Sequence, residues 1–81
     1  MAEKLPDARA LFERHYLEMR ARCLALAADL DRIDRAAGGE QMQTDARVEK
    51  LRRGIGVLLE KRPDRAERVQ MIFSDTTPVQ R

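Results

Sequence analysis

The sequence predicts an all-α protein, a helical hairpin of three helices that dimerises into a bundle. Apolar side chains recur every three or four residues from Phe12 to Ala37, with the period of about 3.5 that is typical of a helix packed along another helix. Two breaks follow, at Gly38 and Gly39 and then at Pro63. The short polar stretch after the first break favours an antiparallel return, so a long helix is followed by a broken second arm.

The first predicted helix covers residues 7–37 and contains no glycine or proline. Asp7 can cap its free N–H groups, and Gly38 and Gly39 end it, because glycine adopts the left-handed conformation of helix ends at little cost. Oppositely charged side chains four residues apart, such as Glu18 and Arg22, support it weakly.

This helix carries two apolar faces. The larger stripe consists of Phe12, Tyr16, Met19, Cys23, Leu26, Leu30, Ile33 and Ala37. The smaller stripe lies nearly opposite and consists of Ala10, Leu17, Ala21, Leu24 and Ala28. A helix with one packing neighbour needs one stripe. We therefore predict that the second arm covers one face and that a second copy of the chain covers the smaller stripe. The alternative is that its two leucines are simply exposed.

The second helix is predicted over residues 45–61, after a polar loop at 38–43, with Thr44 as its N-cap. Its apolar face is formed by Val48, Leu51, Ile55, Leu58 and Leu59. Val57 lies off this face. Gly54 and Gly56 lie inside the helix, and each weakens it by about 1 kcal/mol relative to alanine. Either packing alone holds this helix together, or the bare backbone allows close approach of a partner or ligand.

Pro63 breaks the arm, and a third helix is predicted over residues 64–73, with an ion pair between Asp64 and Arg68. Its apolar side, which includes Val69 and Phe73, is expected to pack on the start of the larger stripe. The second and third helices together are about as long as the first, at the usual rise of about 1.5 Å per residue. The arm could therefore run back along all of it. Residues 74–81 are expected to form a flexible tail.

Composition limits the class of protein. The 81 residues suit a single small domain with a marginal core of its own, which also favours self-association. No apolar run is long enough for a signal peptide or a membrane span. The single cysteine, Cys23, fits a reducing cytoplasm. The formal net charge of +2 is only a weak argument for a polyanionic partner.

Two sets of residues are candidates for chemistry. His15 is the single histidine, and Glu18 lies three residues later, so the pair could ligate a metal in a small helical bundle. No second histidine or Glu-x-x-His motif supports such a site, and a boundary histidine bonded to a carboxylate or water is the simpler interpretation. We expect no cofactor and no catalytic activity, because no nucleophile is paired with a base.

The second set is basic. Arg62, Arg65 and Arg68 surround Pro63 and could bind an anion or the backbone of a nucleic acid. Interleaved acidic residues and the lack of nearby aromatic side chains argue against this role. The sequence therefore favours a small helical interaction or structural module that acts as a homodimer and has a possible further protein partner. A nucleic-acid accessory protein and a metal-binding bundle are the alternatives.

Overall fold

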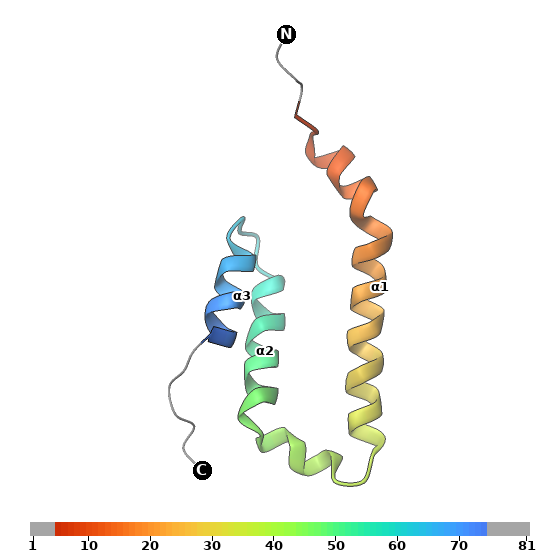
Figure 1. Cartoon of the computed structure of the whole chain (residues 1–81), viewed down its shortest axis with the longest axis vertical. Coiled ribbons are helices and arrows are strands. Elements are labelled where there is room, and N and C mark those ends of the chain that lie inside the picture. The colour runs from red at the N-terminus through yellow and green to blue at the C-terminus, as the bar shows by residue number, and fades with distance from the viewer. Residues whose placement is uncertain (1–4, 75–81) are drawn as a thin grey trace. The chain divides into compact units, whose positions relative to one another are not determined.

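A computed structural model gives the fold of this chain and describes residues 5–74. Helices account for 81% of these residues, and this part of the chain contains no strand, so the all-α prediction is confirmed (Figure 1). The helices are α1 (Ala8–Arg35), the 3₁₀ helix η1 (Gly39–Thr44), α2 (Ala46–Leu58) and α3 (Arg65–Ser74). The first forms one compact unit and the other three form a second, here called the C-terminal unit. Apart from Ser74, the predicted tail lies outside the described residues.

α1 begins where the sequence predicts and ends two residues early. Asp7 is its N-cap, and its Oδ1 accepts a hydrogen bond of 2.9 Å from the Ala10 N–H, as expected. At the other end, Ala36 is extended, and its N–H donates to the Ile33 carbonyl. The chain therefore leaves the helix before it reaches Gly38, which takes the left-handed conformation with φ 85°.

No residue of α1 is buried. The predicted pair of Glu18 and Arg22 is present, and Asp29 also pairs with Arg32. All four side chains are mostly exposed, and such surface pairs contribute a few tenths of a kcal/mol each. Most helix stability in proteins comes from packing an apolar face rather than from propensity. α1 therefore has the sequence of a packed helix without a buried side chain.

The segment before α2 differs from the predicted loop. Residues 39–44 form η1, and the Thr44 hydroxyl donates to the Gln41 carbonyl at 2.9 Å. This bond closes the last turn of η1, so the prediction that Thr44 caps α2 is wrong. Asp45 is the N-cap, and its Oδ1 accepts a 2.8 Å hydrogen bond from the Arg47 N–H. A carboxylate at this position also interacts favourably with the positive end of the helix dipole.

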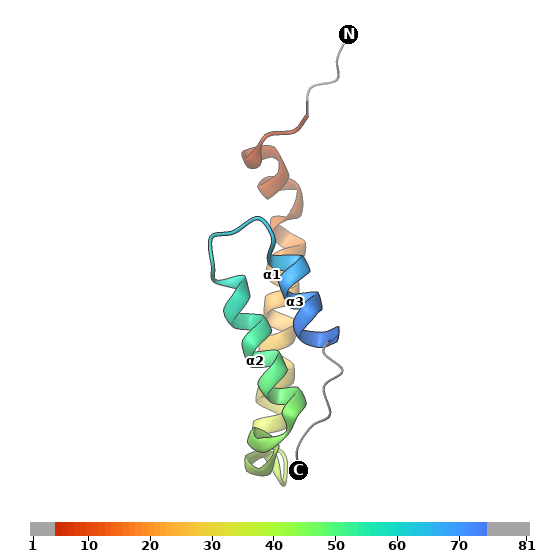
Figure 2. The same cartoon turned by 90° about the vertical axis from the view of Figure 1, so that its left-hand side faces the viewer.

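α3 folds back on α2 in the opposite direction. Glu60, just after α2, pairs with Arg68 near the start of α3, whereas Gly54 lies beside Phe73 near the end of α3. Figures 1 and 2 both show the two helices side by side. The predicted agreement in length is therefore wrong. The arm has only the length of α2, about 20 Å, against about 42 Å for α1.

The buried face of α2 also differs from the prediction. Val57 is only 5% exposed, and Gly54 is buried, whereas Leu58 is 55% and Leu59 is 82% exposed. The helix ends at Leu58, three residues earlier than predicted. The reason is the position of α3, which covers the side of α2 that carries Gly54 and Val57 and leaves the last two leucines outside the contact.

The two glycines of α2 have different surroundings. A Cβ atom on Gly54 would lie 3.4 Å from Phe73 Cε2 and 3.8 Å from Val69 Cγ1, both on α3. α3 therefore packs closely on α2 at Gly54, where a Cβ atom would just fit in van der Waals contact. A Cβ atom on Gly56 would meet nothing within 4 Å. The predicted close approach is thus made within the chain at Gly54, and Gly56 faces open space.

Leucine at each glycine separates these two environments. Gly54→Leu should destabilise the C-terminal unit by about 1–3 kcal/mol, because the added atoms must displace Phe73 and Val69. Gly56→Leu should stabilise it by up to about 1 kcal/mol, because it removes a helical glycine without a clash. Hydrogen exchange of the Val57 amide measures both effects locally. Equal changes in the two variants would show that α3 does not pack on Gly54.

Candidate functional site

A groove runs along the seam between α2 and α3. Its volume is about 610 Å³, and it is lined by Arg53, Gly56, Val57, Glu60, Arg68, Met71 and Ile72. Residues three, four and seven positions apart lie on one face of a helix. The first four lining residues follow this spacing along α2 and its end, and the last three follow it along α3. Two adjacent helix faces therefore form its walls.

The middle of the groove is apolar. Val57 forms its most buried part, Ile72 is half-buried, and Met71 is 66% exposed. Gly56 adds no side chain, and the space above its Cα is open. The groove therefore presents apolar surface together with room for a side chain that this part of the molecule does not supply.

Charged side chains lie at both ends of the groove. Arg68 Nη1 donates a 2.6 Å hydrogen bond to Glu60 Oε1, so these two groups form an ion pair across the seam. Arg53 lies one turn before Gly56 on α2 and is exposed. Within residues 5–74, no hydrogen-bond acceptor or acidic partner is found for Arg53. Two cations and one carboxylate thus surround the apolar surface.

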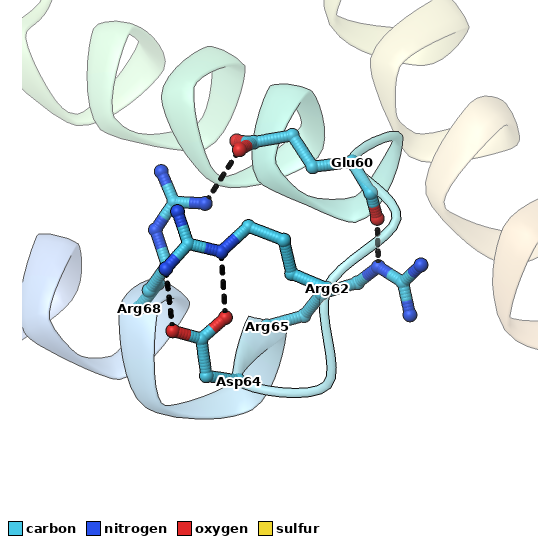
Figure 3. A network of polar contacts seen from close by, with 5 residues as sticks. All are labelled: Glu60, Arg62, Asp64, Arg65 and Arg68. Carbon is cyan, nitrogen blue, oxygen red and sulfur yellow. Dashed lines mark hydrogen bonds and ion pairs between the residues drawn. The ribbon is translucent and has the colours of Figure 1, made fainter.

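A polar network holds the turn between α2 and α3 (Figure 3). Arg62 donates two hydrogen bonds to Asp64, from Nε at 3.0 Å and from Nη2 at 2.8 Å. Arg65 Nε donates to the backbone carbonyl of Glu60. The last carbonyls of a helix lack partners within the helix, so Arg65 supplies a donor beside the C-terminal end of α2. The Glu60–Arg68 pair completes the network and joins the two helices.

These contacts shift the acidity of the groups involved. The hydrogen bond from Arg68 lowers the pKa of Glu60, although partial desolvation opposes the shift. The hydrogen bond from Arg62 likewise lowers the pKa of Asp64. Conversely, the hydrogen bond to Glu60 raises the pKa of Arg68. The carboxylates of the turn are thus stabilised in their charged form.

The three arginines of the predicted anion site all have acceptors within the chain. Arg62 binds Asp64, Arg65 binds the Glu60 carbonyl, and Arg68 binds the Glu60 carboxylate. The expected ion pair between Asp64 and Arg68 is replaced by these partners. Asp64 directly precedes α3, and its carbonyl accepts from the Arg68 N–H at 3.1 Å, whereas its carboxylate binds Arg62. Binding of an external anion at these arginines stays a prediction.

The other predicted site residues lie on α1. His15 and Glu18 are exposed, and the Glu18 carboxylate accepts a hydrogen bond from Arg22. Across the described part of the chain, no three His, Cys, Asp or Glu side chains are grouped to hold a metal ion. Of the five residues predicted to form the dimer interface, Ala28 is half-buried and the other four are exposed, namely Ala10, Leu17, Ala21 and Leu24.

The sequence does not predict the groove, although two of its lining residues, Gly56 and Arg68, are among the candidates from the sequence. Gly56 carried a signal, since a glycine inside a helix needs a reason. The sequence pattern predicts Val57 off the apolar face, because the glycines that share its buried side of α2 contribute no hydrophobic side chain to the pattern. Met71 had no signal, because the position of α3 against α2 decides whether it lines a surface.

Comparison of the chain with protein-family models, with curated proteins and with solved structures finds no significant match. Among the described residues, none of the helices combines the length and the apolar character that a membrane span needs.

The network predicts a stability that depends on pH. The pKa of Glu60 is lowered in the folded chain. The Glu60 carboxylate therefore adds to the free energy of unfolding at neutral pH, and this contribution is lost as the pH falls below the ordinary carboxylate pKa of about 4. Wild type should therefore be more stable than Glu60→Gln at pH 7, and the gap should close as the solution is made more acidic. Urea denaturation of both proteins across this range measures the gap.

Glu67→Gln provides the matched control for this experiment. Glu67 is exposed on α3 and does not belong to the network, so the same charge change there should give a smaller gap. A Glu60→Gln gap that stays constant from pH 7 to pH 2 would mean that the ion pair with Arg68 contributes nothing to folding.

Proposed function

We propose that this protein is a small helical interaction module that forms a homodimer through the smaller apolar stripe of α1. The observation that carries the proposal is the exposure of this stripe: Leu17 is 73% and Leu24 is 56% exposed, and α1 has no buried residue over its 28 positions. A helix with this much exposed apolar surface gains stability from a partner helix.

The stripe is suited to pairing with its own copy. Leu17 and Leu24 are separated by one heptad, and the remaining positions, which are Ala10, Ala21 and Ala28, are small. Small residues allow two helix backbones to approach closely, while the leucines fill the space between them. Full burial of a leucine contributes about 1.5–3 kcal/mol. A symmetric dimer buries one copy of each leucine from each of its two chains, and this burial is enough to affect association strongly.

The larger stripe supports the rest of the proposed architecture. It includes Phe12 and Tyr16, whose rings lie 5.3 Å apart between centroids and are both about half exposed. We assign this face to the second arm, which returns antiparallel to α1 in a helical hairpin. Two hairpins joined through the smaller stripe then form a bundle. The exposed free thiol of Cys23 is consistent with a place in the reducing cytoplasm.

In this proposal the protein acts through its surfaces and has no catalytic activity of its own. The groove supports that view, because its lining combines apolar side chains with two arginines and one glutamate. Such a lining suits the binding of an amphipathic segment. Nucleic-acid binding is a weaker candidate, since the arginines around Pro63 already have acceptors within the chain.

Replacement of Leu24 by glutamate tests the dimer. Wild type should have about twice the chain mass of 9.3 kDa by light scattering. Leu24→Glu places a charge against the partner helix and removes leucine burial, so it should weaken association more than about tenfold. The measurement is the solution mass over a range of dilution, with circular dichroism to verify helix content.

Ala27→Glu is the control, because it adds the same charge to the same turn of α1 at an exposed position outside both stripes. It should keep the wild-type mass. A Leu24→Glu protein that remains a dimer of unchanged stability would place the interface elsewhere, and a wild-type monomer at high concentration would rule out the homodimer.

A further inference from the structure

The groove between α2 and α3 offers a second binding surface, separate from the apolar stripes of α1. We infer that it binds a helix of another protein that carries a large apolar side chain with a carboxylate about one turn away. The partner is thus an acidic amphipathic helix. The inference depends on three features of the described residues: the open space at Gly56, the apolar lining of the seam and the charges at its ends.

Gly56 gives the first argument. Glycine weakens a helix relative to alanine, and within a folded unit the usual compensation is close packing of a neighbour. Gly54 has that compensation, because Phe73 and Val69 lie against it. Gly56 has none, since a Cβ atom there would meet nothing within 4 Å. The open position faces the groove, where a side chain from outside can take the space that a Gly56 substituent would fill.

The lining gives the second argument. Val57, Met71 and Ile72 surround this open position with apolar surface. The groove volume of about 610 Å³ falls within the range of about 300–1,000 Å³ that is usual for ligand sites. Met71 is flexible and polarisable, so it can adapt to the shape of an incoming side chain. A nucleic-acid backbone would leave this apolar surface unused, whereas an apolar anchor would bury it.

The charges give the third argument and define the partner. Glu60 is neutralised by Arg68 at 2.6 Å, so the surplus charge of the rim is positive and belongs to Arg53. A carboxylate can form a charge-assisted hydrogen bond with Arg53, whereas a lysine or arginine of a partner would be repelled. Because Arg53 and Gly56 are one turn apart on α2, the carboxylate and the apolar anchor must be about one turn apart on the partner helix.

The elongated shape of the groove along the two helices also favours a helix as the ligand. The lining residues of α2 continue from Arg53 to Glu60, about two turns, and those of α3 follow beside them. An elongated surface of this kind, with an apolar middle and charged ends, is typical of recognition in which the apolar face of a helix lies in a groove. The ligand would then lie along both helices and bury Met71.

The test uses full-length protein and three fluorescent synthetic peptides that share one helical host sequence. The first carries leucine with glutamate four residues away, the second replaces that leucine with alanine, and the third replaces the glutamate with lysine. Fluorescence anisotropy measures binding. The first peptide should bind saturably, and each replacement should weaken binding about tenfold or more, because each removes one of the two recognised groups.

Three protein variants place the binding in the groove. Gly56→Leu should abolish binding while the protein stays folded, because the new side chain fills the open space. Arg53→Glu should reverse the preference, so that the lysine peptide binds better than the glutamate peptide. Arg52→Glu is the matched control, since it makes the same charge change one residue away and outside the groove lining, and it should leave binding unchanged.

Several results would overturn the inference. These are no binding of the first peptide to wild type, equal binding of all three peptides, or unchanged binding to Gly56→Leu. A change in the solution mass of Gly56→Leu would show that a second copy of the chain occupies the groove, and the inference of a separate partner would be wrong. These readouts differ from the mass of Leu24→Glu, so failure here leaves the proposed dimer to be judged independently.

Discussion

The packing of α3 against α2 holds the C-terminal unit together, and the Phe73 ring lies against Gly54 in this contact. Because Gly54 has no side chain, a Cβ atom there would already lie 3.4 Å from Phe73 Cε2, and any larger group would push α3 away from α2. This approach buries Val57 and brings Arg68 within 2.6 Å of Glu60. The groove and the ion pair across the seam both depend on this packing of α3 on α2.

Local signals in the sequence predicted the elements well, and contacts between elements were predicted poorly. Asp7 and Pro63 act on their immediate neighbours, so the start of α1 and the break after α2 follow from residue chemistry alone. Which side of α2 is buried depends on where α3 lies. A period of 3.6 residues identifies an apolar stripe. It does not show that the side of α2 with Gly54 and Val57 is the one that α3 covers.

The arginines around Pro63 illustrate the same limit for the site. The sequence shows cations mixed with carboxylates, and the spacing rule for helices pairs Asp64 with Arg68. That rule requires both residues to be inside one helix, whereas α3 begins at Arg65. Asp64 is therefore free to bind Arg62, and Arg68 reaches back to Glu60. The sequence shows which charged residues surround Pro63, but their ion-pair partners depend on the conformation of the turn.

A small core connects these observations with function. In the described residues, Val57 is the only large apolar side chain counted as buried, so little of the chain's apolar surface is used internally. Any molecule that binds only the folded form adds to stability by mass action. The stripe of α1 and the groove differ in chemistry, since the stripe is long and uncharged and the groove is short with a positive rim. This difference is why we propose a second copy of the chain for the stripe and an acidic helix of another protein for the groove.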